Sequence, residues 1–316
     1  MIACPTTFVV GAGASCAHGL PTGSELLKQA RGLNADSPVF QLLHQSGVSL
    51  ERLQRFIARI TPTTVRSIDS FLEKRQLEPE IISTGKAVIA GLLGESIHNG
   101  RKRKQTNGED WIFQVIDHMH QGVADWPAFA KRNSPVRFVT FNFDSIIEDR
   151  LAEIVRGIFD NPSPTAEQIA EVLPVIHVHG QLPPVPSDAL FSDSIQPFPA
   201  KWIQWVKDAQ KTIRIAYEDG PYTQALPAQD AVRCAHVLCF LGFGYDRGNL
   251  ERIGLPDAFG VLPPNSATSP AVFGSAVGLS PGFQQEVKTR LRGLITLASS
   301  DHACEQVIAE HHILRG

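Results

Sequence analysis

A chain of 316 residues is long enough for one large domain or two small ones, and 43% hydrophobic with 19% charged residues is the composition of a soluble enzyme. The 29 basic and 32 acidic residues give a net charge of -3, which argues against general attraction to nucleic acid or to an anionic membrane. The longest apolar run, 237–243, is far shorter than the ~20 residues of a spanning helix, and residues 1–5 lack the features of a signal peptide, so we expect a cytoplasmic protein.

Six apolar segments have the length of buried strands: residues 7–10, 136–141, 172–178, 237–241, 272–277 and 294–297. Segments with apolar residues at helical spacing separate most of them, at 24–31, 144–156, 223–234 and 282–292. Strands that are apolar on both sides are typical of parallel sheets covered by helices. The pattern therefore predicts an α/β protein with a Rossmann-like open parallel sheet.

More than a hundred residues separate the first two predicted strands, and most of them have helical spacing, at 39–60, 67–77, 81–98 and 110–119. We therefore expect residues 34–133 to form a large helical layer inserted after the first strand, with 1–33 and 134–316 forming the Rossmann-like domain.

Two polar stretches interrupt this pattern. Residues 98–108 contain the basic run Arg101, Lys102, Arg103 and Lys104 between two Asn-Gly pairs. The run could touch a phosphate backbone, but a solvated loop is the favoured interpretation. Residues 181–200 are rich in proline and serine and are expected to form a lid or a surface loop.

Ligands of open α/β sheets bind beyond the carboxyl ends of the strands. Four predicted strands run into unusual residues there: Gly11, Ala12, Gly13, Ala14 and Ser15 after the first; Asn142, Phe143 and Asp144 after the second; His179 and Gly180 after the third; Gly242, Phe243, Gly244, Tyr245 and Asp246 after the fourth. We expect all four sets to lie on one edge of the sheet.

The glycine turn can bring backbone amides close to a pyrophosphate, or it can be a tight turn that needs small residues. The dinucleotide pattern G-x-G-x-x-G would need glycine at Cys16. Asn142 and Asp144 could orient a sugar hydroxyl or a water. Alternatively, Asp144 is the N-cap of the following helix and Asn142 only closes the turn.

His177 and His179 are spaced to leave a strand on the same face, and such a pair can bind a metal. No acidic or cysteine third ligand is near them in the sequence, and no two of the five cysteines have C-x-x-C spacing, so we expect no metal site and no disulfide framework. His179, at a strand end, is the better acid/base candidate. We expect His177 to be a satisfied polar residue.

Taken together, these motifs resemble those of the sirtuin superfamily. Residues 11–22 (GAGASCAHGLPT) are similar to the sirtuin loop G-A-G-x-S-x-x-x-G-[IL]-P, residues 140–144 (TFNFD) to T-Q-N-x-D, and His179-Gly180 to the catalytic H-G, while Gly242-Phe243-Gly244 occupies the place of G-T-S. The chain lacks the two C-x-x-C pairs that bind zinc in the deacylases, and Thr22-Gly23 replaces their Phe-Arg. It therefore resembles the zinc-free sirtuin-like branch of bacterial phage-defence proteins, to whose L-G-[FY]-G/S-x-x-D segment residues 240–250 are similar.

The resemblance implies a sirtuin/DHS-like fold in which NAD is the substrate and water cleaves its nicotinamide–ribose bond, without a metal. Asn142 would orient the nucleophile, His179 would act as the base, and Asp144 would bind the nicotinamide carboxamide. The other expected NAD-binding residues are Gly11, Ala12, Gly13, Ser15, Pro21, Gly242, Phe243, Gly244 and Asp246. The product would be ADP-ribose or a cyclised form.

Two other functions share this cofactor: an NAD-dependent protein deacylase, and a non-catalytic sensor of NAD or ADP-ribose. A plain Rossmann dehydrogenase is disfavoured by Cys16 and by the broken strand spacing. Defence NADases of this kind are often inactive until an activator or partner subunit engages them, so we expect such a partner, and a homo-oligomer.

Overall fold

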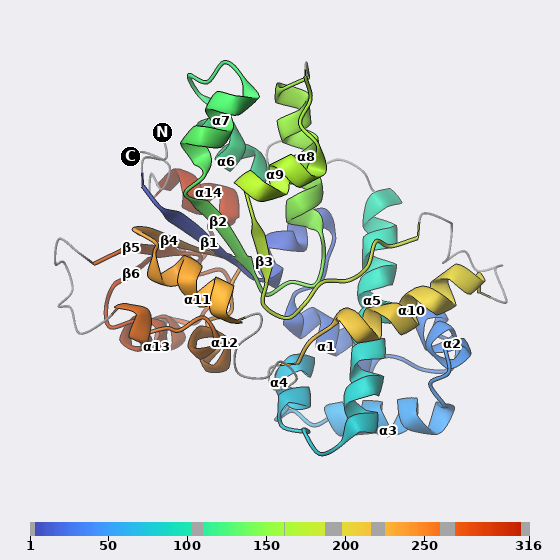
Figure 1. Ribbon diagram of the computed structural model, residues 1–316. Helices are drawn as coiled ribbons and strands as arrows, with labels where there is room; N and C mark the ends of the chain where they lie inside the picture. The colour runs from blue at the N-terminus through green and yellow to red at the C-terminus, as the bar shows by residue number, and fades with distance from the viewer. Residues whose placement is uncertain are drawn as a thin grey trace.

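The computed structural model describes residues 4–102, 110–160, 162–186, 198–215, 225–259 and 269–310. Six strands form one parallel sheet in the order β3-β2-β1-β4-β5-β6 (Figure 1). They are β1 (Thr6–Val10), β2 (Val136–Thr140), β3 (Val175–His177), β4 (Val237–Leu241), β5 (Ala271–Gly274) and β6 (Ile295–Leu297). This is the doubly wound Rossmann order, and it confirms the predicted α/β class with an open parallel sheet.

Successive side chains of each strand point to opposite sides of the sheet. Because the strands are apolar on both sides, helices pack on both faces. Phe8 packs with one set of helices and Val9 with the other. On the side of Phe8 lie α6 (Trp111–His120), α7 (Trp126–Asn133), α8 (Ile146–Ile158), α9 (Ala166–Val172) and α14 (Cys304–Glu310). On the side of Val9 lie α11 (Ala225–Arg233), α12 (Arg247–Arg252), the 3-10 helix η2 (Asp257–Phe259) and α13 (Pro281–Arg290).

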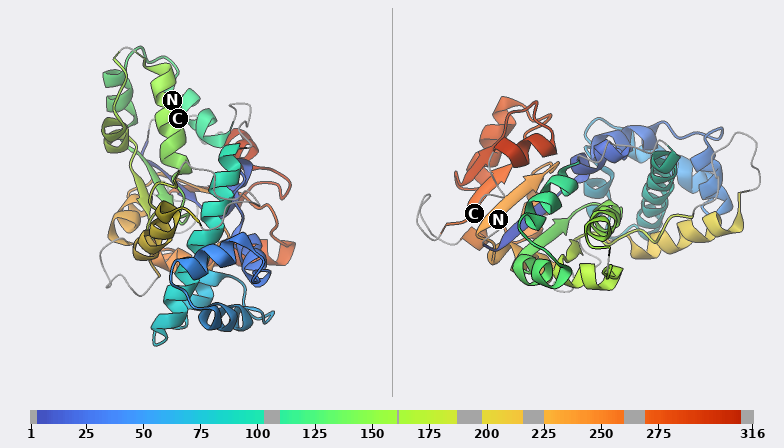
Figure 2. Two further views of the ribbon diagram at one scale, coloured as in Figure 1. Left: turned by 90° about the vertical axis from the view of Figure 1, so that its right-hand side faces the viewer. Right: turned by 90° about the horizontal axis from the view of Figure 1, so that it is seen from above.

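A separate helical body stands beyond the carboxyl ends of the strands, which point toward it (Figures 1 and 2). It has its own apolar core, built from α1 (Gly23–Arg31), α2 (Pro38–Gln45), α3 (Leu50–Ile60), α4 (Ile68–Glu73), α5 (Pro79–Lys102) and α10 (Ala200–Thr212). The long helix α5 runs through this body, and glycines let its neighbours approach. A Cβ at Gly91 would lie 2.9 Å from Val39, and one at Gly94 would lie 2.8 Å from the Trp205 ring.

The packing crosses the boundaries predicted for the insertion at 34–133. Helices α6 and α7 fall within that range but pack on the sheet. Helices α1 and α10 fall outside it but pack in the helical body. The division into two domains stays a prediction, and the helical body is assembled from two separate stretches of the chain.

Three predicted element limits were wrong. The strand predicted at 172–178 begins only at Val175, because α9 continues to Val172. The helix predicted at 39–60 is two helices, separated at Gly47, whose φ is +100°. The turn predicted at Gly100 lies inside α5, where the missing side chain leaves room for the carbonyl oxygen of His18, 2.8 Å from where a Cβ would be.

Parts of two predicted loops, 103–109 and 187–197, lie outside the described residues. Within the described ranges, none of the helices combines the length and the apolar character needed to cross a membrane.

Candidate functional site

The point where the strand order reverses lies between β1 and β4, whose carboxyl ends carry the two glycine-containing turns. The 3-10 helix η1 (Ala12–His18) follows β1 directly. A Cβ at Gly11 would lie 2.6 Å from the carbonyl oxygen of Gly242, and one at Gly242 would lie 2.0 Å from the amide nitrogen of Ala14. The glycines are therefore needed because two backbones touch here.

The amides of this turn are partly used inside the protein. Gly11 donates to the carbonyl oxygen of Leu241 at 2.9 Å, and Gly13 donates to that of Gly242 at 3.0 Å. Gly242 has a φ of +58° and donates in turn to the hydroxyl of Ser275 at 2.9 Å. Gly11, Gly13 and Gly242 thus fix the shape of the turn rather than offering these amides to a phosphate.

Three buried polar side chains meet beside this turn, as expected from their places at the strand ends. Nδ2 of Asn142 donates to Oγ of Ser15 at 3.0 Å and to the carbonyl oxygen of Gly11 at 3.2 Å. The Ser15 hydroxyl lies 3.3 Å from Oδ2 of Asp144. Ser15, Asn142 and Asp144 are 3–6% exposed, and we call them the polar cluster.

Asp144 lies just before α8, where Oδ1 accepts a hydrogen bond from the amide of Ile146 at 3.1 Å. The N-cap position of the helix is Ser145 and not Asp144 as the alternative interpretation had it. Burial raises the pKa of Asp144 to about 6, although the Ile146 amide, the charge of His177 and the Ser15 hydroxyl all oppose this rise. A carboxyl group of this kind exchanges its proton close to neutral pH, which is typical of functional sites.

His179 lies apart from the polar cluster, on the α12 side of the sheet. Its ring packs against Phe141 with centroids 5.3 Å apart, and its Nε2 lies 3.3 Å from Oδ1 of Asn249. Burial, reinforced by the charge of Arg252, lowers the pKa of His179 to about 4, so the ring is neutral at physiological pH. Gly180, at φ +76°, lets the chain pass the end of α10, since a Cβ there would lie 2.0 Å from the carbonyl oxygen of Thr212.

His177 faces the opposite direction. Strand β3 ends at His177, so strand alternation does not extend to His179, and the expectation that both side chains share a face was wrong. The ring of His177 lies between the carbonyl oxygen of Asn142, 3.0 Å from Nδ1, and Oε1 of Glu148, 2.6 Å from Nε2. His177 is thus a satisfied polar residue, as predicted.

The turn after β4 forms the part of the candidate site that lies on the α12 side of the sheet. Phe243 packs against Phe141 with ring centroids 5.1 Å apart. Gly244 is exposed, with open space where a Cβ would be. Asp246 caps α12 by accepting hydrogen bonds from the amides of Gly248 at 2.9 Å and Asn249 at 3.3 Å.

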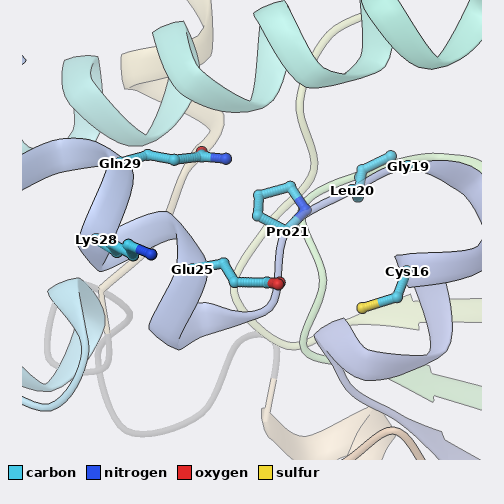
Figure 3. A pocket seen from close by; sticks show the side chains of 7 residues that line it. All are labelled: Cys16, Gly19, Leu20, Pro21, Glu25, Lys28 and Gln29. Atoms are coloured by element: carbon cyan, nitrogen blue, oxygen red, sulfur yellow. The ribbon is translucent and has the colours of Figure 1, made fainter. Parts of the chain in front are cut away.

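A cavity of about 550 Å³ opens beside the residues that follow η1 (Figure 3). Its lining comes from the end of η1, the segment that follows it and the first two turns of α1: Cys16, Gly19, Leu20, Pro21, Glu25, Lys28 and Gln29. The Thr22 hydroxyl and the Glu25 carboxylate form a capping box at the start of α1. Small-molecule sites measure roughly 300–1,000 Å³, so a ligand of moderate size fits here.

Glu148 and Asn249, the partners of His177 and His179, were not predicted from the sequence. Asn249 lies three positions after Asp246, the N-cap of α12, so the sequence spacing places these two residues on the same face of the helix. Glu148 carries no such signal, because its contact depends on how α8 packs on the sheet. Among the described residues, no group of three or more His, Cys, Asp or Glu could hold a metal ion.

No protein-family model matches this chain, and no curated protein matches it. The function is therefore argued from the site itself.

Proposed function

We propose that this chain binds NAD at the carboxyl edge of its sheet and hydrolyses the nicotinamide–ribose bond, as the zinc-free sirtuin-like NADases do. The polar cluster carries this proposal. Ser15, Asn142 and Asp144 are buried together at the strand-order reversal, where packing alone would favour apolar side chains. A buried hydroxyl, carboxamide and carboxyl group provide donors and acceptors for a polar substrate group.

The residues fit a dinucleotide in two respects. The cavity beside Pro21 has about 550 Å³ and combines apolar with polar lining, which suits a nucleotide with a flat base and polar sugars. Gly11, Gly13 and Gly242 hold the turn in shape, and we assign the phosphates to the backbone of Ala12 and Ser15.

On the other side of the turn we assign ligand contacts to Phe243, Gly244 and Asp246. Gly244 is the exposed member of this set, with room for a ligand against the backbone. Phe243 offers a ring next to Phe141. These three residues follow β4, whereas the residues of the polar cluster follow β1 and β2, so the substrate would bridge the strand-order reversal.

Asp144 suits the role of binding the nicotinamide carboxamide. With a pKa of about 6, the carboxyl group can accept a hydrogen bond from the amide NH2 or donate one to its oxygen near neutral pH. Positioning the carboxamide twists the nicotinamide ring relative to the ribose and favours its departure.

In the reaction, the bond between C1′ of the ribose and the nicotinamide nitrogen breaks, and its electron pair stays on neutral nicotinamide. The ribose becomes oxocarbenium-like, and a water oxygen adds to C1′ while its proton passes to His179. His179 is neutral and has an unprotonated ring nitrogen to take that proton, but with its pKa lowered to about 4 by burial it is a weak base that gives the proton on to solvent. Asn142 orients the water. Nicotinamide, ADP-ribose and one proton are the products.

The test is chromatographic detection of nicotinamide released from NAD by the purified protein. Asn142→Ala and His179→Ala are expected to reduce release at least roughly 100-fold. Two matched controls should retain it. Asn133→Ala removes another fully buried asparagine, whose Nδ2 donates to Phe129 at the end of α7. His236→Ala removes an exposed histidine at the amino end of β4.

The same assay separates the alternatives. Release that needs an acetylated peptide would identify a deacylase and overturn hydrolysis. A sensor would bind NAD or ADP-ribose in a calorimetric titration. It would release no nicotinamide even when phage lysate is added as a source of activator. We further propose that the protein acts in antiphage defence with an activator or partner subunit and as a homo-oligomer, which light scattering with and without that lysate tests.

A further inference from the structure

The ring of His177 is held between two groups that only accept hydrogen bonds. Nδ1 lies 3.0 Å from the backbone carbonyl oxygen of Asn142, and Nε2 lies 2.6 Å from Oε1 of Glu148. Neutral imidazole has one N–H donor, whereas imidazolium has two. Both contacts are hydrogen bonds only if the ring is doubly protonated, so the geometry favours the imidazolium.

We infer that His177 is a positioning residue: as an imidazolium it fixes the carbonyl group of Asn142 and holds a positive charge beside Asp144. The inference rests on the proposed function for its effect on catalysis. It does not make His177 catalytic, since the ring touches the backbone of the Asn142–Asp144 turn and not the polar cluster itself.

The charges around the ring support this protonation state. Glu148 faces it from α8, Asp144 lies in the turn, and the neutral Gln181, from the segment after β3, donates to the same Oε1 of Glu148 at 2.7 Å. The side chain of His177 is only 9% exposed. Burial lowers the pKa of His177, but the hydrogen bond and charge of Glu148 outweigh burial, so the pKa is raised.

Protonation of His177 affects the polar cluster by two routes. First, the backbone of Asn142 sets the direction of its side chain, whose Nδ2 reaches Ser15 and Gly11. Second, the charge of His177 stabilises the carboxylate of Asp144. When the ring loses a proton, one of its two acceptors loses its donor, and Asp144 loses a nearby positive charge. The positive charge and the second N–H donor of His177 are present at pH values below its raised pKa, and both are lost as the pH rises through that pKa.

The direct test is an NMR titration of the intact protein with labelled imidazole rings. In wild type, His177 is expected to keep both N–H groups to a pH above the usual titration range of histidine, and Glu148→Gln is expected to lower its titration midpoint by about one pH unit or more. The matched pair His302–Glu310, with Nδ1 2.6 Å from Oε2, should not respond to Glu148→Gln. A His177 midpoint at or below the ordinary histidine value of about 6.5, or an unchanged midpoint in Glu148→Gln, would overturn the inference.

The kinetic test uses His177→Gln, which keeps an amide donor without a charge. It is expected to reduce kcat roughly 10- to 100-fold, with a smaller change in KM, and to abolish the alkaline limb of the pH profile. Glu148→Gln should move that limb to lower pH by the shift seen in the titration, and His302→Gln should leave kcat unchanged. A retained limb in His177→Gln would contradict the inference.

Failure of the proposed function gives a different result. If wild type releases no nicotinamide, hydrolysis is refuted, and the titrations still decide the inference. In that case a raised midpoint of the labelled Asp144 carboxyl in His177→Gln supports positioning of the turn, and an unchanged one refutes it.

Discussion

Replacing Gly242 by alanine tests whether two touching backbones define the turn at the centre of the candidate site. The new Cβ would lie 2.0 Å from the amide nitrogen of Ala14 and 2.4 Å from the carbonyl carbon of Gly13. Both neighbours are backbone atoms, so no side chain can rotate away. The turn after β1 would have to move away from the turn after β4.

The expected cost has two parts. A non-glycine residue at φ +58° costs about 1–2 kcal/mol, and overpacking of a close-packed region costs about 1–3 kcal/mol. We therefore expect Gly242→Ala to lower the free energy of unfolding by about 2–5 kcal/mol. With an unfolding entropy of about 2.1 cal/mol/K per residue, this lowers the Tm of a chain of this length by roughly 3–8 °C.

Gly244→Ala is the matched control. It lies two residues away in the same turn, has open space around the added Cβ, and is absent from the residues with positive φ. Its effect on stability should stay within about 0.5 kcal/mol. Urea unfolding and thermal unfolding of both variants provide the comparison. Equal midpoints for the two variants would refute the argument that contact between the turns requires glycine at position 242.

Two further stability predictions follow from the burial and contacts of other residues. The pKa of Asp144 is about 6 in the folded chain and about 3.9 when unfolded, so its contribution to stability is present below pH 4 and lost as the pH rises through 6. Asp144→Asn should therefore stabilise the protein at pH 8 by up to about 3 kcal/mol relative to its effect at pH 4; equal urea midpoint shifts at the two pH values would contradict this. Arg31 donates to the carbonyl oxygens of Ile60, Pro62 and Val65 at 2.9–3.0 Å, so Arg31→Met should lower the free energy of unfolding by about 1–3 kcal/mol, whereas Arg233→Met, which removes only an exposed ion pair, should cost less than about 0.5 kcal/mol. Comparable losses for the two arginine variants would show that the three hydrogen bonds of Arg31 do not stabilise the fold.

The central strands could be predicted from the sequence because they are buried on both faces. β4 coincides with the predicted residues 237–241, and β1 differs by one residue. The limits of β3 could not be predicted, because the mainly apolar segment 172–178 contains both the end of α9 and the whole of β3. Helix α9 did carry a signal, the capping box of Thr165 and Gln168.

Helix α10 was missed although Trp202, Trp205 and Val206 have helical spacing and are buried. The predicted proline- and serine-rich loop ends at residue 200, where α10 begins, and no element was predicted for the rest of that helix. Its partner α5 is about a hundred residues earlier in the chain, and no local pattern shows that the two pack together.

The candidate site was predictable at the level of the sheet edge. Parallel strands bring their carboxyl ends together, so the segments that contain Ser15 and Asn142 were expected on one edge, and Nδ2 of Asn142 lies 3.0 Å from Oγ of Ser15. The separation of His177 from His179 was not predictable, because it depends on where β3 ends. The contact of Glu148 depends on how α8 packs against the sheet, which sequence spacing does not specify.

The order of the strands has a consequence for how the chain folds as it is synthesised. Thr6 of β1 pairs with Val136 and with Val237, partners 130 and 231 residues later. At about 5–20 residues per second, the second partner is made roughly 10–50 s after β1. During that time the apolar β1 has an unpaired edge, a template for aggregation. Helices α1 to α5 are synthesised in this interval and can pack against one another. Their partner α10 and the pairing of β1 with β4 come only after the later part of the chain has been synthesised.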